Sequence, residues 1–124
     1  MLRIKRIRVS NNPGDLFECF QILREVIDRS SERDWFLSEV EDKAVSETHF
    51  SLGVWIRDEW GLWKKNTRIY KLLLGLGLTH ADDMSAFILR SFHRFLNDRE
   101  LRLFEQVENI NAIRIENEKK YLSK

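Results

Sequence analysis

The chain has 124 residues, which fits a single domain, and 43% of them are hydrophobic while 33% are charged. This apolar share excludes a disordered chain, because it is large enough to bury a core. The longest apolar run, 72–78, is far shorter than the ~20 residues that a membrane span needs. Because the sequence shows no secretion leader and only one cysteine, Cys19, it predicts a cytoplasmic protein with no membrane contact, internal disulfide or cysteine metal site.

The charges nearly cancel, because 21 Lys and Arg residues stand against 20 Asp and Glu residues. A net charge of +1 argues against a dedicated nucleic-acid binder, which usually has a strong basic excess. The distribution is less even, since 61–72 holds four basic residues and no acid, and 36–60 holds six acids and two basic residues. Solvated faces explain both stretches, and a basic and an acidic patch are the alternative.

The first elements follow from hydrophobic spacing. Apolar and basic residues alternate over 1–11, which predicts a basic arm or a short strand. A turn around Pro13 precedes apolar residues spaced three and four apart, which predicts a helix that ends near Asp28. Either Asn12 or Asp15 can cap the start of this helix.

The rest of the chain also has helical spacing. Gly61 is placed to end one helix, and Gly75 and Gly77 to end the next. Asn66 or Thr67 is expected to start the helix before Gly75, and Thr79 or Asp82 to cap the one after it. The expected helices cover about 33–43, 49–60, 67–74, 82–96 and 100–122.

The sum is an all-α fold, a compact bundle of five to six helices in a single domain over 1–124. Its tail, 116–124, is expected either to fray or to dock on a partner. If Ile110, Ile113 and Tyr121 lie exposed on a free helix, a homodimer is expected, because exposed apolar stripes usually mark interfaces.

The middle of the chain carries an unusual motif. Residues 49–63 read HFSLGVWIRDEWGLW, 77–85 read GLTHADDMS, and 88–97 read ILRSFHRFLN. These segments resemble a bacterial family known as domain of unknown function 6794, whose members read HFGLG-WIRN-WGLW and then G-HPDDMS--IL--YHR-LN. The resemblance covers about 47–106, and three tryptophans with a DDMS run at fixed spacing make it specific.

The resemblance implies a shared fold and no mechanism, because no activity is assigned to the family. The chain departs from the family pattern at Asp58, Ala81 and Phe92, where the family has Asn, Pro and Tyr. None of these changes removes an obvious catalytic group, although Asp58 adds a negative charge beside Arg57.

The motif histidines raise the question of a metal site. His49, His80 and His93 are 31 and 13 residues apart, unlike a compact helical ligand pair with four-residue spacing. A histidine at a helix start usually caps or packs. No metal and no cofactor are therefore expected.

Acid–base chemistry is the second class that these residue types allow. Asp82 and Asp83 have a simpler role at a helix start, where carboxylates stabilise the positive end of the dipole. Ser85 has no nucleophile elbow around it, and Cys19 lies on an apolar helix face. If the protein is an enzyme, the candidates are His49, Arg57, His80, Asp82, Asp83, His93 and Arg94.

The tryptophans give a candidate binding surface. In a domain this small we expect Trp55 and Trp60 in the core, while Trp63 is open between core packing and an aromatic platform beside Lys64 and Lys65. Arg57 is expected to pair with Asp82 or Asp83 and so to join the two motif segments.

We therefore interpret the chain as a small, non-catalytic protein that binds and modulates another protein, in the manner of an inhibitor, immunity or anti-defence protein. That class rests on analogy alone. The first surface to test is acidic, Glu39, Glu41 and Asp42, since acidic faces cap basic sites. The alternatives are the enzyme above and nucleic-acid binding through the N-terminal arm and 64–71.

Overall fold

The computed structural model describes residues 12–122, and this part of the chain is all-helical with no strand. The arm or strand expected over 1–11 lies outside the described residues. Seven helices follow one another, where five to six were expected. They are α1 (Leu16–Asp28), α2 (Arg33–Ser38), α3 (Glu41–Thr48), α4 (Leu52–Glu59), α5 (Arg68–Leu76), α6 (Ala81–Leu96) and α7 (Leu103–Leu122).

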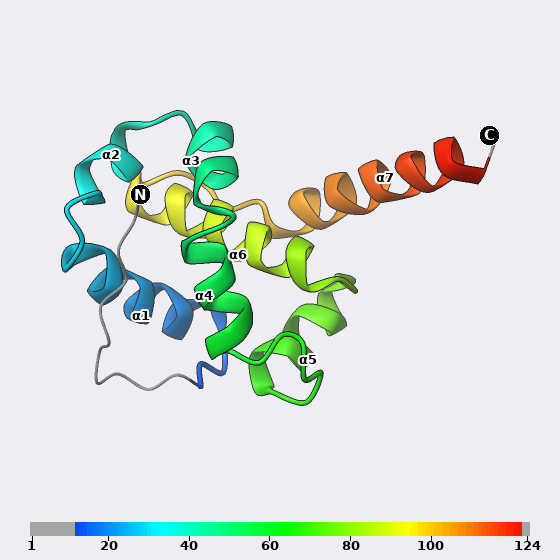
Figure 1. Ribbon diagram of the computed structural model, residues 1–124, viewed down its shortest axis with the longest axis horizontal. Coiled ribbons are helices and arrows are strands. Elements are labelled where there is room, and N and C mark those ends of the chain that lie inside the picture. Colours follow the sequence, from blue (N-terminus) through cyan, green and yellow to red (C-terminus); the bar gives the residue numbers. More distant parts are fainter. Residues whose placement is uncertain (1–11, 123–124) are drawn as a thin grey trace.

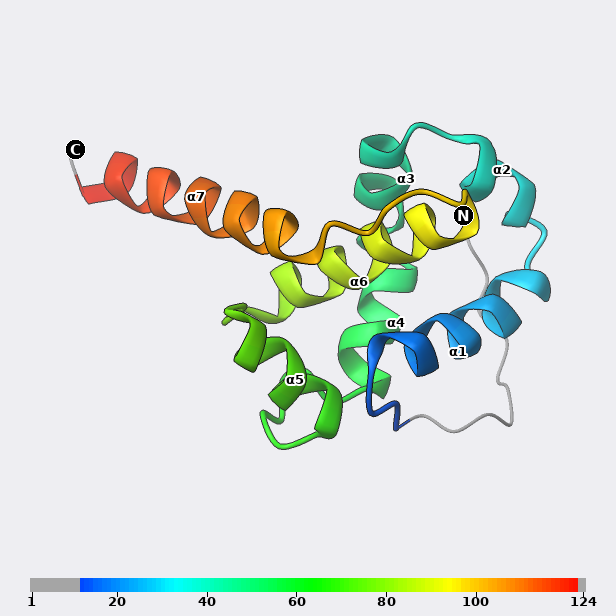
Figure 2. The same ribbon diagram turned by 180° about the vertical axis from the view of Figure 1, so that it is seen from behind.

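Helix α6 is the centre of the fold. It contacts α1, α2, α3, α4 and α7, and Figures 1 and 2 show it crossing the middle of the body. Several of its apolar side chains, among them Phe87, Ile88 and Phe92, are fully buried, while Phe95 and Leu96 are partly buried. Nine of its 16 residues are buried, and these include Ser85, Ser91 and His93 besides the apolar side chains, which suits a helix that is covered on several sides.

Helix α1 confirms the predicted helix and one of its two predicted caps. The carboxylate of Asp15 accepts a hydrogen bond from the Glu18 backbone N–H at 2.8 Å, and the Glu18 carboxylate accepts one from the Gly14 N–H at 2.9 Å. This reciprocal pair satisfies two backbone donors that have no partner within the helix. Cys19 lies on the buried face, as expected, and burial raises the pKa of its thiol.

Helix α5 also agrees with its sequence signals. The Thr67 hydroxyl accepts a hydrogen bond from the Tyr70 backbone N–H, and the helix ends at Gly77 in the left-handed conformation (φ 110°). A Cβ at Gly77 would also lie 3.3 Å from the side chain of Val107, so glycine suits both the turn and the packing of α7.

The region 33–60 differs from the prediction. The helix expected over 33–43 is interrupted. Glu39 and Val40 have extended backbone conformations (ψ 153° and 137°), and they separate α2 from α3. The helix expected from His49 begins only at Leu52, after a turn that follows α3. The Thr48 hydroxyl donates to the Ala44 carbonyl at 2.7 Å, a local hydrogen bond typical of a helix end.

The start of α6 has a different cap from either predicted one. His80 occupies the cap position without a side-chain hydrogen bond to the helix. The Thr79 hydroxyl instead bonds the His80 ring at 2.9 Å, and the carboxylate of Asp82 turns toward Arg57.

Helix α7 leaves the body. Figures 1 and 2 show its second half extending past α6 into solvent, and 116–122 continue as helix with all side chains exposed. Only Gln106 and Val107 of this helix are buried. Within 12–122, no single helix is long and apolar enough to cross a membrane; α5 and α6 meet that test only together, across an 89° bend.

Candidate functional site

A buried arginine joins the two halves of the motif. Arg57 is 5% exposed, and its guanidinium donates to the Ser85 hydroxyl at 2.8 Å and to the His49 carbonyl at 3.1 Å. Its Nε lies 3.5 Å from a carboxylate oxygen of Asp82, which confirms one of the two predicted pairings. The contacts fix α4 and the turn before it against the start of α6.

The other predicted partner of this arginine has a different role. Asp83 accepts a hydrogen bond from Nε of Arg114 at 2.7 Å, and this bond links the first turn of α6 to the middle of α7. The hydrogen bond and the negative charge of Asp83 raise the pKa of Arg114. The two adjacent aspartates therefore bind different helices: Asp82 binds α4 through Arg57, and Asp83 binds α7 through Arg114.

His93 and Arg94, two further candidate catalytic residues, lie at the far end of α6. The His93 ring is buried against Phe36, and its Nε2 bonds the Glu39 carbonyl at 2.9 Å. Asp82 and His93 are 11 residues apart on one helix, which separates them by about 16 Å. His80 bonds its neighbour Thr79 at the helix start.

The predicted His/Asp/Arg cluster is therefore not brought together. Its members divide among contacts at the start of α6, a tie to α7 and contacts at the end of α6. Among residues 12–122, no group of three or more His, Cys, Asp or Glu side chains could hold a metal ion.

The predicted acidic surface is largely neutralised within the chain. The carboxylate of Glu41 contacts Arg90 and Arg94 at 2.6 Å and Arg99 at 3.6 Å. Burial raises the pKa of Glu41, but hydrogen bonds from Arg94 and Arg90 outweigh burial and lower this pKa from 4.5 to about 2. Glu41 is thus a tie between α3 and α6, and its side chain is only 12% exposed.

The two other members of that surface are more accessible. The carboxylate of Asp42 lies 2.6 Å from Arg90, although its side chain is 85% exposed. Glu39 lies 3.6 Å from Lys43, four residues along the chain. Each of the three carboxylates forms an ion pair with a basic side chain of the same chain, so none of them presents an isolated negative charge.

The segment 60–67, which we name the Trp63 loop, presents an exposed tryptophan of the motif to solvent. Trp60 and Leu62 are buried, as predicted for Trp60, whereas Trp55 is half-buried and packs edge-on against Trp60. Between the two buried side chains, Gly61 has a φ of 62°, which favours glycine. Trp63 itself is 59% exposed.

The loop is also closed at its second end. The Thr67 hydroxyl donates to the Trp60 carbonyl at 2.9 Å, and a Cβ added at Gly61 would come within 2.7 Å of the Thr67 methyl group. Both ends of the loop are therefore held by contacts, and the side chains of Trp63, Lys64 and Lys65 are presented to solvent.

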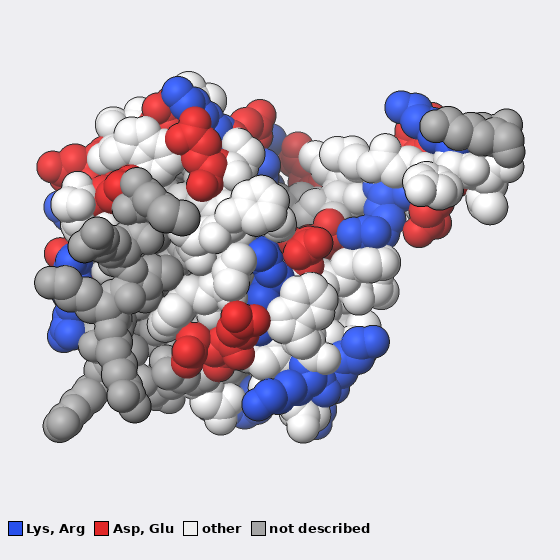
Figure 3. All heavy atoms as spheres, in the orientation of Figure 1, with Lys and Arg blue, Asp and Glu red and all other residues white. Residues whose placement is uncertain are grey.

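Charge separates on this face of the molecule. Figure 3 shows basic side chains gathered over α5 and acidic side chains over the nearby part of α4. The loop and α5 supply Lys64, Lys65, Arg68 and Lys71, all exposed. Arg68 bonds the carbonyl of Asn12, so one of these cations is used within the fold.

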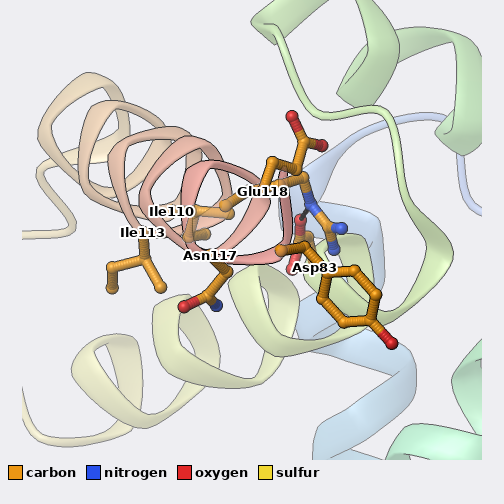
Figure 4. A pocket seen from close by; sticks show the side chains of 7 residues that line it. Asp83, Ile110, Ile113, Asn117 and Glu118 are labelled. Carbon is orange, nitrogen blue, oxygen red and sulfur yellow. Dashed lines mark hydrogen bonds and ion pairs between the residues drawn. The ribbon is translucent and has the colours of Figure 1, made fainter. Parts of the chain in front are cut away.

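A second surface lies along α7. Two hollows, of about 250 and 330 Å³, share Ile110 and Ile113 in their linings. Figure 4 looks along α7 at the first of them and shows Ile113 and Asn117 pointing to the same side of the helix. The apolar spacing of 110, 113 and 121 indicated this surface. The hollows are also lined by Asp83, Arg90 and Asp42, and no sequence pattern connects these residues to α7.

The class defined by these features is a small all-helical domain, built around a central helix and a buried arginine that joins the motif segments. The chain belongs to the family described as domain of unknown function DUF6794, whose model matches residues 12–96. The match thus runs from the start of the described chain to the end of α6, and α7 lies beyond it. No match to a curated protein or to a solved structure is found.

Proposed function

We propose that this protein is a non-catalytic binding module that presents the Trp63 loop to another protein. The observation that carries the proposal is the contrast between Trp63, which is 59% exposed, and its buried neighbours Trp60 and Leu62. An indole held outside the core does not contribute its full area to stability, and tryptophan is enriched among residues that dominate binding energy.

The geometry of the loop favours binding. Its ends are fixed by the buried side chains and by the hydrogen bond between Thr67 and Trp60, so little conformational entropy is lost when Trp63 is covered. Lys64 and Lys65 flank the indole, which suits an apolar pocket with an acidic rim on the partner. Modulation of that partner, as by an inhibitor, immunity or anti-defence protein, is the role that we propose for this small module.

Nucleic-acid binding is the second candidate. The basic side chains over α5 beside an exposed indole support it, because single-stranded nucleic acid is bound by cations together with aromatic stacking. The net charge of +1 gives it less support than the first candidate.

The test is affinity capture from the native host with the wild-type chain and two variants, Trp63→Ala and Val40→Ala. Val40 is the matched control, since it is also largely exposed but lies between α2 and α3, away from α5 (Figure 1). We expect a stoichiometric protein partner with the wild type and with Val40→Ala, and its loss with Trp63→Ala.

A partner retained by Trp63→Ala would contradict the proposal. Nucleic acid in the captured material, lost on nuclease treatment and with a steep dependence on salt, would favour the second candidate. Circular dichroism of each variant confirms that the helices are intact.

A further inference from the structure

The second half of α7 has an apolar edge that the body does not cover. Ile113 is 63% exposed and Tyr121 is 85% exposed, and both lie on the side of the helix that carries Ile110. Helices that stand alone in water are marginal, and most helical stability in proteins comes from packing of an apolar face. This edge therefore fits a partner, and the surface around it indicates which one.

The two hollows form one trough along α7, with Ile113 at its middle. One hollow continues from Ile113 toward Asn117 and Tyr121. The other continues in the opposite direction, past Asn109 to Gln106, where the body supplies Asp42, Arg90 and Arg94. The trough thus has a projecting aromatic side chain at one end and a cavity of about 330 Å³ at the other.

The spacing of these features is self-complementary. Gln106 lies seven residues before Ile113, and Lys120 lies seven residues after it, about 10 Å in each direction. A second α7 that runs antiparallel, with the two Ile113 side chains at the dyad, places its Lys120 and Tyr121 opposite the Gln106 end. The projecting end of each copy then meets the cavity of the other, as an isologous two-fold interface requires.

The charges of α7 favour the same orientation. On the side of α7 that carries Ile113, Lys120 lies near one end of the trough and Glu105 lies near the other end, whereas Arg114 is already bound to Asp83. An antiparallel pair brings Lys120 of each copy close to Glu105 of the other and opposes the helix dipoles, while a parallel pair brings like charges together. In the receiving cavity, Arg90 is neutralised by Asp42 and Glu41, so the lining does not repel an incoming lysine.

We infer that the α7 trough binds the α7 of a second copy of this chain, antiparallel and centred on Ile113. This dimer interface is separate from the Trp63 loop and does not depend on the proposed function.

The test is the mass of the full chain in solution, measured by sedimentation equilibrium over a wide range of concentration. The wild type is expected to pass from 14.9 kDa to twice that mass as concentration rises. Ile113→Glu is expected to weaken dimerisation at least tenfold, because it buries two carboxylates at the dyad. Ile115→Glu is the matched control, since Ile115 is 53% exposed but points about 160° away around the helix.

A wild type that stays at 14.9 kDa, or equal weakening by Ile113→Glu and Ile115→Glu, would overturn the inference. Tyr121→Ser gives a second variant, at a position that is 85% exposed, and it is also expected to weaken the dimer while circular dichroism is unchanged.

Orientation is tested by charge reversal. Lys120→Glu is expected to weaken the dimer, and addition of Glu105→Lys to the same chain is expected to restore it. A parallel pair would show no such rescue, and that result would contradict the antiparallel arrangement.

Discussion

Arg57 shows how one side chain can hold a small helical domain together. A guanidinium is costly to bury unless every donor direction meets an acceptor. Here the Ser85 hydroxyl, the His49 carbonyl and the Asp82 carboxylate surround it. The acceptors come from the turn before α4 and from the first turns of α6, so the contacts fix the relative position of these two elements.

Arg57→Ala is expected to lower the free energy of unfolding by about 3 kcal/mol, because the buried hydrogen bonds and the packing of the side chain are both lost. Urea unfolding followed by circular dichroism measures the change. Arg114→Ala is the matched control: its ion pair with Asp83 is more exposed, so its loss should cost less than about 1 kcal/mol. Equal effects of the two variants would refute the assignment of Arg57 as the main tie.

Gly53 makes room for this guanidinium. A Cβ at this position would lie 3.0 Å from a terminal nitrogen of Arg57, one turn along α4. We therefore expect Gly53→Ala to destabilise the wild type but to stabilise the Arg57→Ala variant by about 0.5–1 kcal/mol, the ordinary helix preference for alanine. A double-mutant cycle of unfolding energies measures the difference, and additive effects would show that the two residues are not coupled.

At this scale the sequence predicted only part of the site. The pairing of Arg57 with an aspartate was predictable because both residues belong to one motif. The acceptor at His49 was not, because a backbone carbonyl is placed by the turn 49–51 and not by the identity of a side chain. Whether Trp63 is buried or exposed was not predictable either, since its exposure depends on how the loop turns at Gly61.

The attachment of α3 to α6 depends on one carboxylate. Glu41 accepts hydrogen bonds from Arg90 and Arg94, and these lower its pKa to about 2 from an ordinary value of 4.5. A carboxyl group with a depressed pKa stabilises the folded state when it is ionised. The contribution is therefore complete above pH 4.5 and is lost as the pH falls toward 2.

Glu41→Gln is expected to remove this pH-dependent contribution. The difference in unfolding free energy between wild type and variant should be largest above pH 4.5 and should shrink as the pH approaches 2. Urea titrations across this range measure it. Asp42→Asn is the control, because the Asp42 side chain also contacts Arg90 but is 85% exposed. A constant difference for Glu41→Gln would contradict the tie.

Helices with clear end signals were predictable, and those without them were not. Helices α1 and α5 have capping residues and a strong apolar period, and both were placed nearly to their ends. The break at Glu39 and Val40 carries neither glycine nor proline, and it is stabilised by tertiary contacts such as the bond from His93 to the Glu39 carbonyl. Local sequence signals therefore predict one helix over α2 and the first part of α3.

At the scale of the whole molecule, the two proposed surfaces lie in different parts of the chain and should affect different measurements. The Trp63 loop belongs to the family domain, whereas α7 lies beyond the matched residues. Changes at Trp63 should alter partner capture without changing mass, and changes at Ile113 should alter mass without changing capture. The apolar spacing on α7 already favoured a homodimer, but the trough could not be predicted from the sequence, because it is assembled by residues from α3, α6 and α7.

The buried thiol of Cys19 has a practical consequence for studies of this chain. It is the one cysteine in the sequence, its side chain is fully buried in α1, and burial raises its pKa, so the reactive thiolate is suppressed in the folded state. Labelling by a thiol reagent then requires α1 to separate from α6. The rate at which Cys19 is labelled therefore reports how often the core opens, and no probe needs to be introduced to measure it.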